Sequence, residues 1–99
     1  MKIDIQSIHF DADAKLLEYI TTKVKKLSTF HDGIIGADVY LKLQKSTDKE
    51  NKVVESKVNV PNGPLFAEQN AVTFEAATDV AVDQLKIQVK RYSEKMKEK

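Results

Sequence analysis

Basic side chains gather in the last sixteen residues of the chain, at a spacing that suits binding to phosphate groups. Residues 84–99 carry six Lys or Arg against two acids, a net charge of +4, whereas residues 1–83 carry a net charge of −3. At about 100° per residue, a helix would place Lys86, Lys90 and Lys97 on one side and Arg91 and Lys95 on its flank. Such a stripe indicates a surface for a nucleic-acid backbone.

A second basic run, KVKK at 23–26, lies in an earlier amphipathic segment. A helix here would place Lys15 and Lys26 on one side with Tyr19, and Lys23 between them and the apolar stripe. If the two helices pack side by side, both basic runs merge into one positive surface. The competing interpretation is that these lysines only solvate two polar faces and complement the helix dipoles.

The sequence contains no pattern typical of an enzyme. His9 and His31 each lie near the end of an expected element, where a lone histidine is usually solvated, and a working site needs several groups. Glu75, Asp79 and Asp83 recur one turn apart, which favours the dipole at a helix start more than a cation site. There is no cysteine and no glycine-rich phosphate loop. We therefore expect no catalysis, no metal and no cofactor.

Length and composition predict one domain spanning residues 1–99. The chain is 41% apolar and 31% charged, as in soluble globular domains. The first residues carry acids where a signal peptide needs an apolar run, and no apolar stretch approaches the ~20 residues of a membrane span. We expect a cytoplasmic protein.

Apolar periodicity predicts the elements that position these charges. Four segments alternate apolar and polar residues as strands do, and two follow the helical period. KSTDKEN at 45–51 and PNG at 61–63 are expected turns. Asp13 and Thr73 are expected to cap the helices. The strands are expected within 2–10, 37–44, 52–60 and 64–69, and the helices within 11–30 and 74–96.

Each element has one face suited to a core. The expected inward residues are Leu16, Leu17, Ile20, Val24 and Leu27 of the first helix, Ala37, Val39, Leu41, Leu43, Val54, Ser56, Val58 and Val60 of the central strands, and the stripe Phe74, Ala77, Ala81, Leu85, Val89, Tyr92 and Met96 of the last helix. The predicted fold class is α+β: a two-layer β-α-β-β-β-α sandwich, with a four-stranded sheet and two helices on one face. The other sheet face would be solvated.

Over essentially its whole length, the chain resembles the short ribosome hibernation factors, the family of hibernation promoting factor and ribosome-associated inhibitor (protein Y). The resemblance lies in LLEYI and KVKKL of the first helix, DVYLKL, VNVPNG and EAATDVAVDQLKIQVKRYSEK. It implies the same sandwich, similar to double-stranded-RNA-binding domains. We expect no linker or second domain after the last helix, which would make the short form the nearer match.

The resemblance also implies a function and a partner. Members of the family lodge in the small ribosomal subunit, in the channel for messenger and transfer RNA, and stop translation in stationary phase or stress. The implied partners are the small subunit, its rRNA and a second hibernation factor, with a monomer away from the ribosome.

The resemblance assigns residues to this contact. Lys23, Lys26 and Arg91 match basic positions of the family, whereas Gln84 and Ile87 stand where basic residues are common. The acidic start of the last helix would remain in solvent. The full expected RNA-binding set is Lys23, Lys26, Lys86, Lys90, Arg91 and Lys95. Two alternatives stay open: a free-standing double-stranded-RNA-binding module, and a protein-interaction module.

Overall fold

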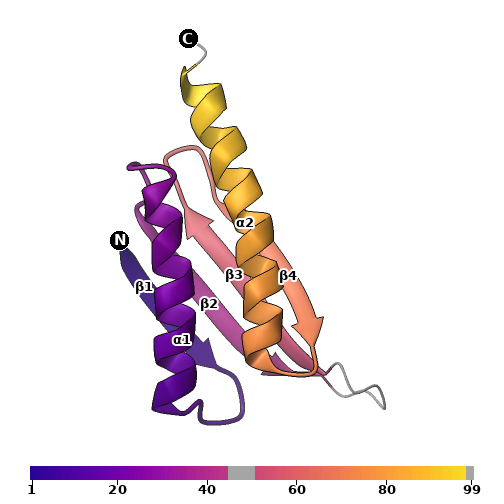
Figure 1. The fold of residues 1–99 in the computed structure, drawn as a ribbon. Helices are drawn as coiled ribbons and strands as arrows, with labels where there is room; N and C mark the ends of the chain where they lie inside the picture. Colours follow the sequence, from indigo (N-terminus) through magenta and orange to yellow (C-terminus); the bar gives the residue numbers. More distant parts are fainter. Residues whose placement is uncertain (45–50, 98–99) are drawn as a thin grey trace.

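The order of helices and strands follows the predicted β-α-β-β-β-α pattern (Figure 1). The structure is a computed structural model that describes residues 1–44 and 51–97, so the predicted turn at 45–51 lies almost wholly outside the described residues. The elements are β1 (Lys2–Ser7), α1 (Ala14–Lys25), the short 3₁₀ helix η1 (Lys26–Thr29), β2 (Gly36–Leu43), β3 (Lys52–Asn59), β4 (Leu65–Ala71) and α2 (Phe74–Lys97). The expected likeness to double-stranded-RNA-binding domains stays a prediction.

The sheet is mixed, with strand order β1-β2-β3-β4. β1 pairs with β2 in parallel, whereas the pairs β2–β3 and β3–β4 are antiparallel. β1 and β4 therefore run in the same direction, and each is followed by a helix that packs back over the same sheet face. As a result α1 and α2 run side by side in the same direction (Figure 1).

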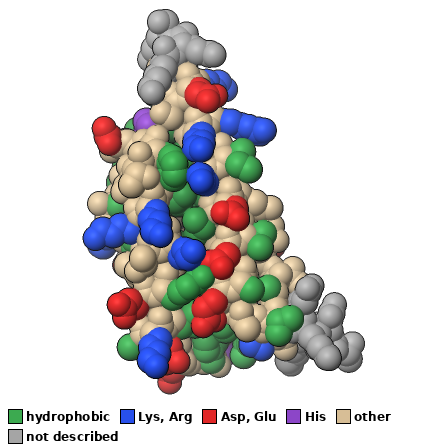
Figure 2. Space-filling model, in the orientation of Figure 1, with side chains coloured by type: hydrophobic (Ala, Val, Ile, Leu, Met, Phe, Trp, Pro, Cys, Tyr) green, Lys and Arg blue, Asp and Glu red, His purple; other side chains and the backbone are tan. Residues whose placement is uncertain are grey.

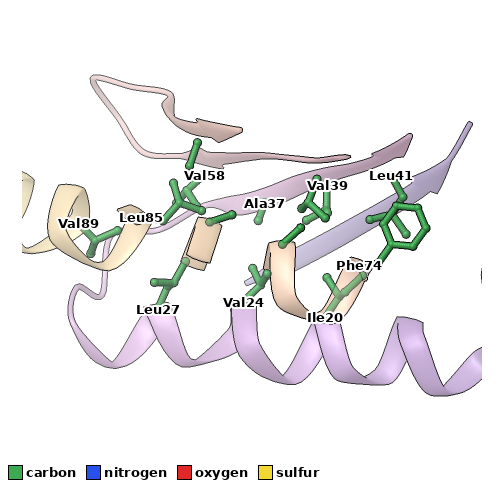
Figure 3. Packing of buried hydrophobic residues seen from close by; sticks show 14 of the residues in the cluster. Ile20, Val24, Leu27, Ala37, Val39, Leu41, Val58, Phe74, Leu85 and Val89 are labelled. Atoms are coloured by element: carbon green, nitrogen blue, oxygen red, sulfur yellow. The ribbon is translucent and has the colours of Figure 1, made fainter. Parts of the chain in front are cut away.

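The core lies between the sheet and the two helices (Figure 3). Side chains of α1 and α2 point towards the inward residues of β2 and β3, and the rings of Phe10 and Phe74 stack with centroids 5.1 Å apart. The side chains that are almost wholly removed from solvent include Ile20, Val24, Leu27, Val39, Leu41, Val54, Val58, Leu85 and Val89. The predicted apolar faces are thus confirmed at most positions.

Both predicted helix caps are confirmed. The Asp13 carboxylate accepts a hydrogen bond of 2.8 Å from the Leu16 backbone N–H, and the Thr73 hydroxyl accepts one of 3.0 Å from Ala76. Each cap satisfies a backbone donor that the first turn of a helix leaves free.

Three inward predictions are wrong at the margins of the core. Leu17 is 36% exposed, because it lies about 100° around α1 from Leu16 and no other element covers that side. Leu43 is 49% exposed, because it ends β2 opposite the first residue of β3, at the rim of the sheet. Met96 is 36% exposed because the last turns of α2 project past the sheet (Figure 1).

The ends of the edge strands also differ from the sequence prediction. β1 stops at Ser7 where the apolar period slips, and His9 adopts a left-handed conformation with φ of 67° that turns the chain towards α1. β4 continues to Ala71, two residues beyond the predicted end. None of the described helices combines the length and apolar character needed to cross a membrane.

Side chains of α2 contact the edge strand β4. The Gln88 side chain accepts a hydrogen bond of 3.3 Å from the Phe66 N–H and donates one of 2.8 Å to the Phe66 carbonyl. One turn earlier, the Gln84 amide accepts a bond of 2.8 Å from Gln69. These contacts fix one flank of α2 against β4 and leave its other flank facing α1.

We predict that Ser56→Ala raises the free energy of unfolding by about 0.5–2 kcal/mol. Ser56 is 2% exposed and its hydroxyl finds no hydrogen-bond partner among the described residues. A buried polar group without a partner costs about 1–3 kcal/mol. Urea denaturation measures the effect, with Leu85→Ala as the control that should lose about 2–5 kcal/mol through its cavity. A loss of stability on Ser56→Ala would contradict the structural account of this position.

Candidate nucleic-acid interface

A groove of about 490 Å³ runs between α1, η1 and α2. Its floor is apolar and its walls carry charges of both signs. In Figure 2, Lys and Arg side chains follow the upper part of the seam between the two helices, and Asp and Glu side chains lie lower along it. The lining residues are Lys23, Lys26, Leu27, Thr29, Phe30, Asp79, Val82, Asp83 and Lys86. The two predicted basic runs therefore meet across one groove.

At the basic end of the groove, two lysines share one aromatic ring. The Nζ atoms of Lys86 and Lys90 lie 5.2 and 5.1 Å from the centroid of the Phe30 ring. The negative face of the ring attracts an ammonium group, by about 0.5–1 kcal/mol at an exposed site. Neither lysine forms an ion pair within the described part of the chain. Phe30 thus holds two positive charges near each other without neutralising them.

At the acidic end, Lys23 is already paired. Its Nζ lies 3.6 Å from Oδ1 of Asp79 and 5.5 Å from the centroid of the Tyr19 ring. The Tyr19 hydroxyl donates a hydrogen bond of 2.6 Å to the same Oδ1. This hydrogen bond, followed by the partial burial of the phenol and the nearby negative charge, raises the pKa of Tyr19 above its usual value.

The acidic start of the last helix was expected to remain in solvent, and Glu75 and Asp83 are exposed, but the expectation missed the contact of Asp79 with α1. Its side chain is 45% exposed, but it faces α1 and bridges the two helices. The physical reason is the common direction of α1 and α2. It places the first half of α2 beside the middle of α1, where Tyr19 and Lys23 project.

The six predicted RNA-binding residues divide into two groups. Lys23, Lys26, Lys86 and Lys90 lie at the groove. Arg91 lies about 140° around α2 from Lys86, on the flank where Gln88 contacts β4, and Lys95 follows one turn later. The side chain of Lys97, which the sequence placed beside Lys86 and Lys90, lies outside the described residues. Sequence reasoning missed Phe30, since nothing local marks a ring whose cationic partners are 56 and 60 residues away.

Charges on the opposite face of the sheet largely pair among themselves. Lys42 lies 2.5 Å from Glu55, and Lys57 lies 3.9 Å from Asp38. The hydrogen bond from Lys42 lowers the pKa of Glu55, whereas the hydrogen bond with Glu55 raises the pKa of Glu68 on the next strand. Among the described residues, this face therefore offers no run of unpaired cations comparable to that on the helix face.

The histidines occupy structural positions. The His31 ring packs edge-on against Tyr92, with centroids 5.0 Å apart, and His9 forms the turn after β1. Within residues 1–44 and 51–97, no group of three or more His, Cys, Asp or Glu side chains is placed to hold a metal ion.

Comparisons with known proteins agree on one family. The family model described as sigma 54 modulation protein / S30EA ribosomal protein matches residues 3–97. The chain is similar to the "Ribosome hibernation promoting factor" of Pseudomonas putida, with 27% identity over 96% of this chain and 89% of that protein. The protein of the same name from Salmonella typhimurium is 28% identical, over 99% of both chains. Among solved structures, the Thermus thermophilus Protein Y N-terminal domain matches with a TM-score of 0.80 and 29% identity, over 93% of this chain and 99% of that one.

We predict that the phenol of Tyr19 titrates above the usual tyrosine range and that Asp79→Asn lowers its pKa. The hydrogen bond to Asp79 stabilises the fold while the phenol is protonated. This contribution is therefore present below pH ~10 and is lost as the pH rises through the raised pKa. A ¹³C NMR titration of the tyrosine Cζ resonances measures it. An unchanged Tyr19 curve in Asp79→Asn would mean that the contact does not form in solution.

Proposed function

The chain belongs to the family described as sigma 54 modulation protein / S30EA ribosomal protein, and from this premise we propose that it is a ribosome hibernation factor. It binds the small ribosomal subunit in the channel for messenger and transfer RNA and inhibits translation in stationary phase or stress. The proposal rests mainly on the groove between α1 and α2, where lysines from both helices converge. The relatives whose lengths it spans carry the name "Ribosome hibernation promoting factor", which supports the proposal.

The proposed mechanism is occupation of the channel, held by contacts to RNA phosphates. Lys26, Lys86 and Lys90 meet the rRNA backbone at the basic end of the groove, where none of them is neutralised by a described carboxylate. Contacts of this kind read the shape of RNA more than its sequence. The protein blocks transfer and messenger RNA by its volume, so the mechanism needs no chemical step.

The apolar floor of the groove adds order to these contacts. Phe30 limits the conformations of two long lysine side chains that would otherwise lose rotamer freedom on binding. Arg91 and Lys95 lie on the far flank of α2 and contribute at longer range. Residues 1–99 act as one ribosome-binding domain in the cytoplasm, as a monomer away from the ribosome, and a second hibernation factor would bind separately.

We predict that the protein sediments with small subunits at low salt and that initiator transfer RNA displaces it. With four or five phosphate contacts, the logarithm of the affinity should fall against the logarithm of the salt concentration with a slope of about −3 to −4. Sucrose-gradient sedimentation over a salt series measures both. Recovery only in the ribosome-free fractions would contradict the proposal, and equally tight binding to naked duplex RNA would favour the free-standing RNA-binding module instead.

We further predict that the combined reversal Lys26→Glu, Lys86→Glu and Lys90→Glu abolishes subunit binding while the fold survives. All three side chains are exposed and none contributes to the core, so surface changes should cost within about 0.5 kcal/mol each. The control is Arg91→Glu with Lys95→Glu, which should weaken binding far less per charge because that flank faces away from the groove. Circular dichroism verifies the fold of both variants. Unchanged binding by the triple variant would remove the groove as the RNA-facing surface.

A further inference from the structure

One carboxylate of the protein occupies a position in the proposed RNA-facing groove where an RNA phosphate would be expected to bind. Oδ1 of Asp79 receives the Tyr19 hydroxyl at 2.6 Å and lies 3.6 Å from Nζ of Lys23. The two donors come from one face of α1, one turn apart, and the acceptor comes from α2. Together they form a small anion site at the rim of the groove, and a residue of the chain itself fills it.

This donor set suits a phosphodiester oxygen as well as a carboxylate. A hydroxyl and an ammonium group both donate to an anionic oxygen, and neither donor distinguishes the two acids. The side chains of Lys23 and Asp79 are 37% and 45% exposed, so a phosphate can approach the pair from solvent. An exposed ion pair contributes little, which makes its exchange for another anion easily reversible.

We propose that Asp79 is an internal competitor of the RNA phosphate, whose carboxylate occupies the anion site of Tyr19 and Lys23 until an RNA phosphate takes over both donors. This inference rests on the proposed function, since it takes the groove as the RNA-facing surface. Asp79 itself remains on α2 and turns towards solvent, while Tyr19 and Lys23 move from the carboxylate to the phosphate.

The competitor makes the two ends of the groove unequal. At the basic end, Lys86 and Lys90 lie over a neutral ring, so a phosphate binds there without displacing an anion. At the other end, each phosphate must displace Asp79 and also approaches its negative charge. An RNA that engages only one end of the groove gains little binding free energy. An RNA that presents phosphates along the whole groove makes both sets of contacts. Asp79 is thus a specificity-determining residue that disfavours loosely matched nucleic acids.

A purely structural role for Asp79 predicts different behaviour. If the carboxylate only ties α1 to α2, its removal changes stability and leaves the number of phosphate contacts unchanged. Asp79→Asn keeps an oxygen that can accept from Tyr19 but removes the charge that holds Lys23. Asp83→Asn is the matched control, because Asp83 lines the same groove one turn later, is exposed, and forms no ion pair within the described residues.

The test measures binding of each variant to a fluorescent 16-base-pair RNA duplex over a salt series. Asp79→Asn should bind the duplex about 3- to 10-fold more tightly at low salt, because Lys23 is released from its ion pair and the repulsion between the carboxylate and the phosphate is removed. Its log–log salt slope should steepen by about 0.7–0.9, the value for one added phosphate contact. Asp83→Asn should gain at most about twofold with an unchanged slope. Adding Lys23→Met to Asp79→Asn should abolish the gain.

Three results would overturn the proposal: equal effects of Asp79→Asn and Asp83→Asn, a gain that survives Lys23→Met, or no binding of the duplex by Asp79→Asn at low salt. Sedimentation with small subunits, run in parallel, separates this inference from the proposed function. If the parent protein does not bind small subunits but Asp79→Asn binds the duplex more tightly in a Lys23-dependent way, the proposed function is wrong and the role of Asp79 as a competitor stands. If the parent protein binds small subunits but Asp79→Asn shows no gain on the duplex, the proposed function stands and the role of Asp79 as a competitor is wrong.

Discussion

The common direction of α1 and α2 is the constraint on which the charged surface depends. β1 and β4 run the same way in the sheet, and each helix must return over the same apolar face after its strand. Burial of the two apolar stripes therefore sets the helices side by side in the same direction (Figure 1). The C-terminal half of α1 and the residues that follow it lie beside the first half and the middle of α2. Lysines that are far apart in sequence become neighbours as a consequence of core packing, and no direct interaction between them is needed.

Bringing like charges together has a cost, and the groove contains two different means of reducing it. The Phe30 ring attracts Lys86 and Lys90 through its quadrupole and leaves their charge intact. Asp79 forms an ion pair with Lys23. On the far side of the sheet, ion pairs such as Lys42 with Glu55 cancel charge locally. Within the described residues, the helix face thus has available cations, whereas Lys42 and Lys57 on the far sheet face are paired with acids, which gives an approaching polyanion a preferred side.

Most of the fold was predictable because local patterns carry it. Alternation defined the strands, the helical period defined α1 and α2, and short-range chemistry defined the caps at Asp13 and Thr73. The errors lie where burial depends on what covers a residue, as at Leu17 and Leu43. The pairing of β1 with β2 in parallel was also absent from the prediction, since single-strand patterns do not encode direction.

The candidate site was predictable only in part for the same reason. Charge counting found the two basic runs, and four of the six predicted residues meet at the groove. It did not separate Arg91 and Lys95 from the others, because that distinction depends on which flank of α2 contacts β4. Nor did it find the partners of Phe30 and Asp79, which lie on the other helix. Contacts between distant segments depend on strand order and helix direction, and local periodicity predicts neither strand order nor helix direction.

The Gln88 amide also affects the tendency of the protein to aggregate through its sheet edge at high concentration. An edge strand with free N–H and C=O groups can recruit a strand from another chain and start β-augmentation or fibril growth. At Phe66 both groups are already bound by a side chain that imitates the hydrogen bonding of a neighbouring strand. An incoming strand would have to displace that amide, so β4 resists intermolecular sheet extension at Phe66.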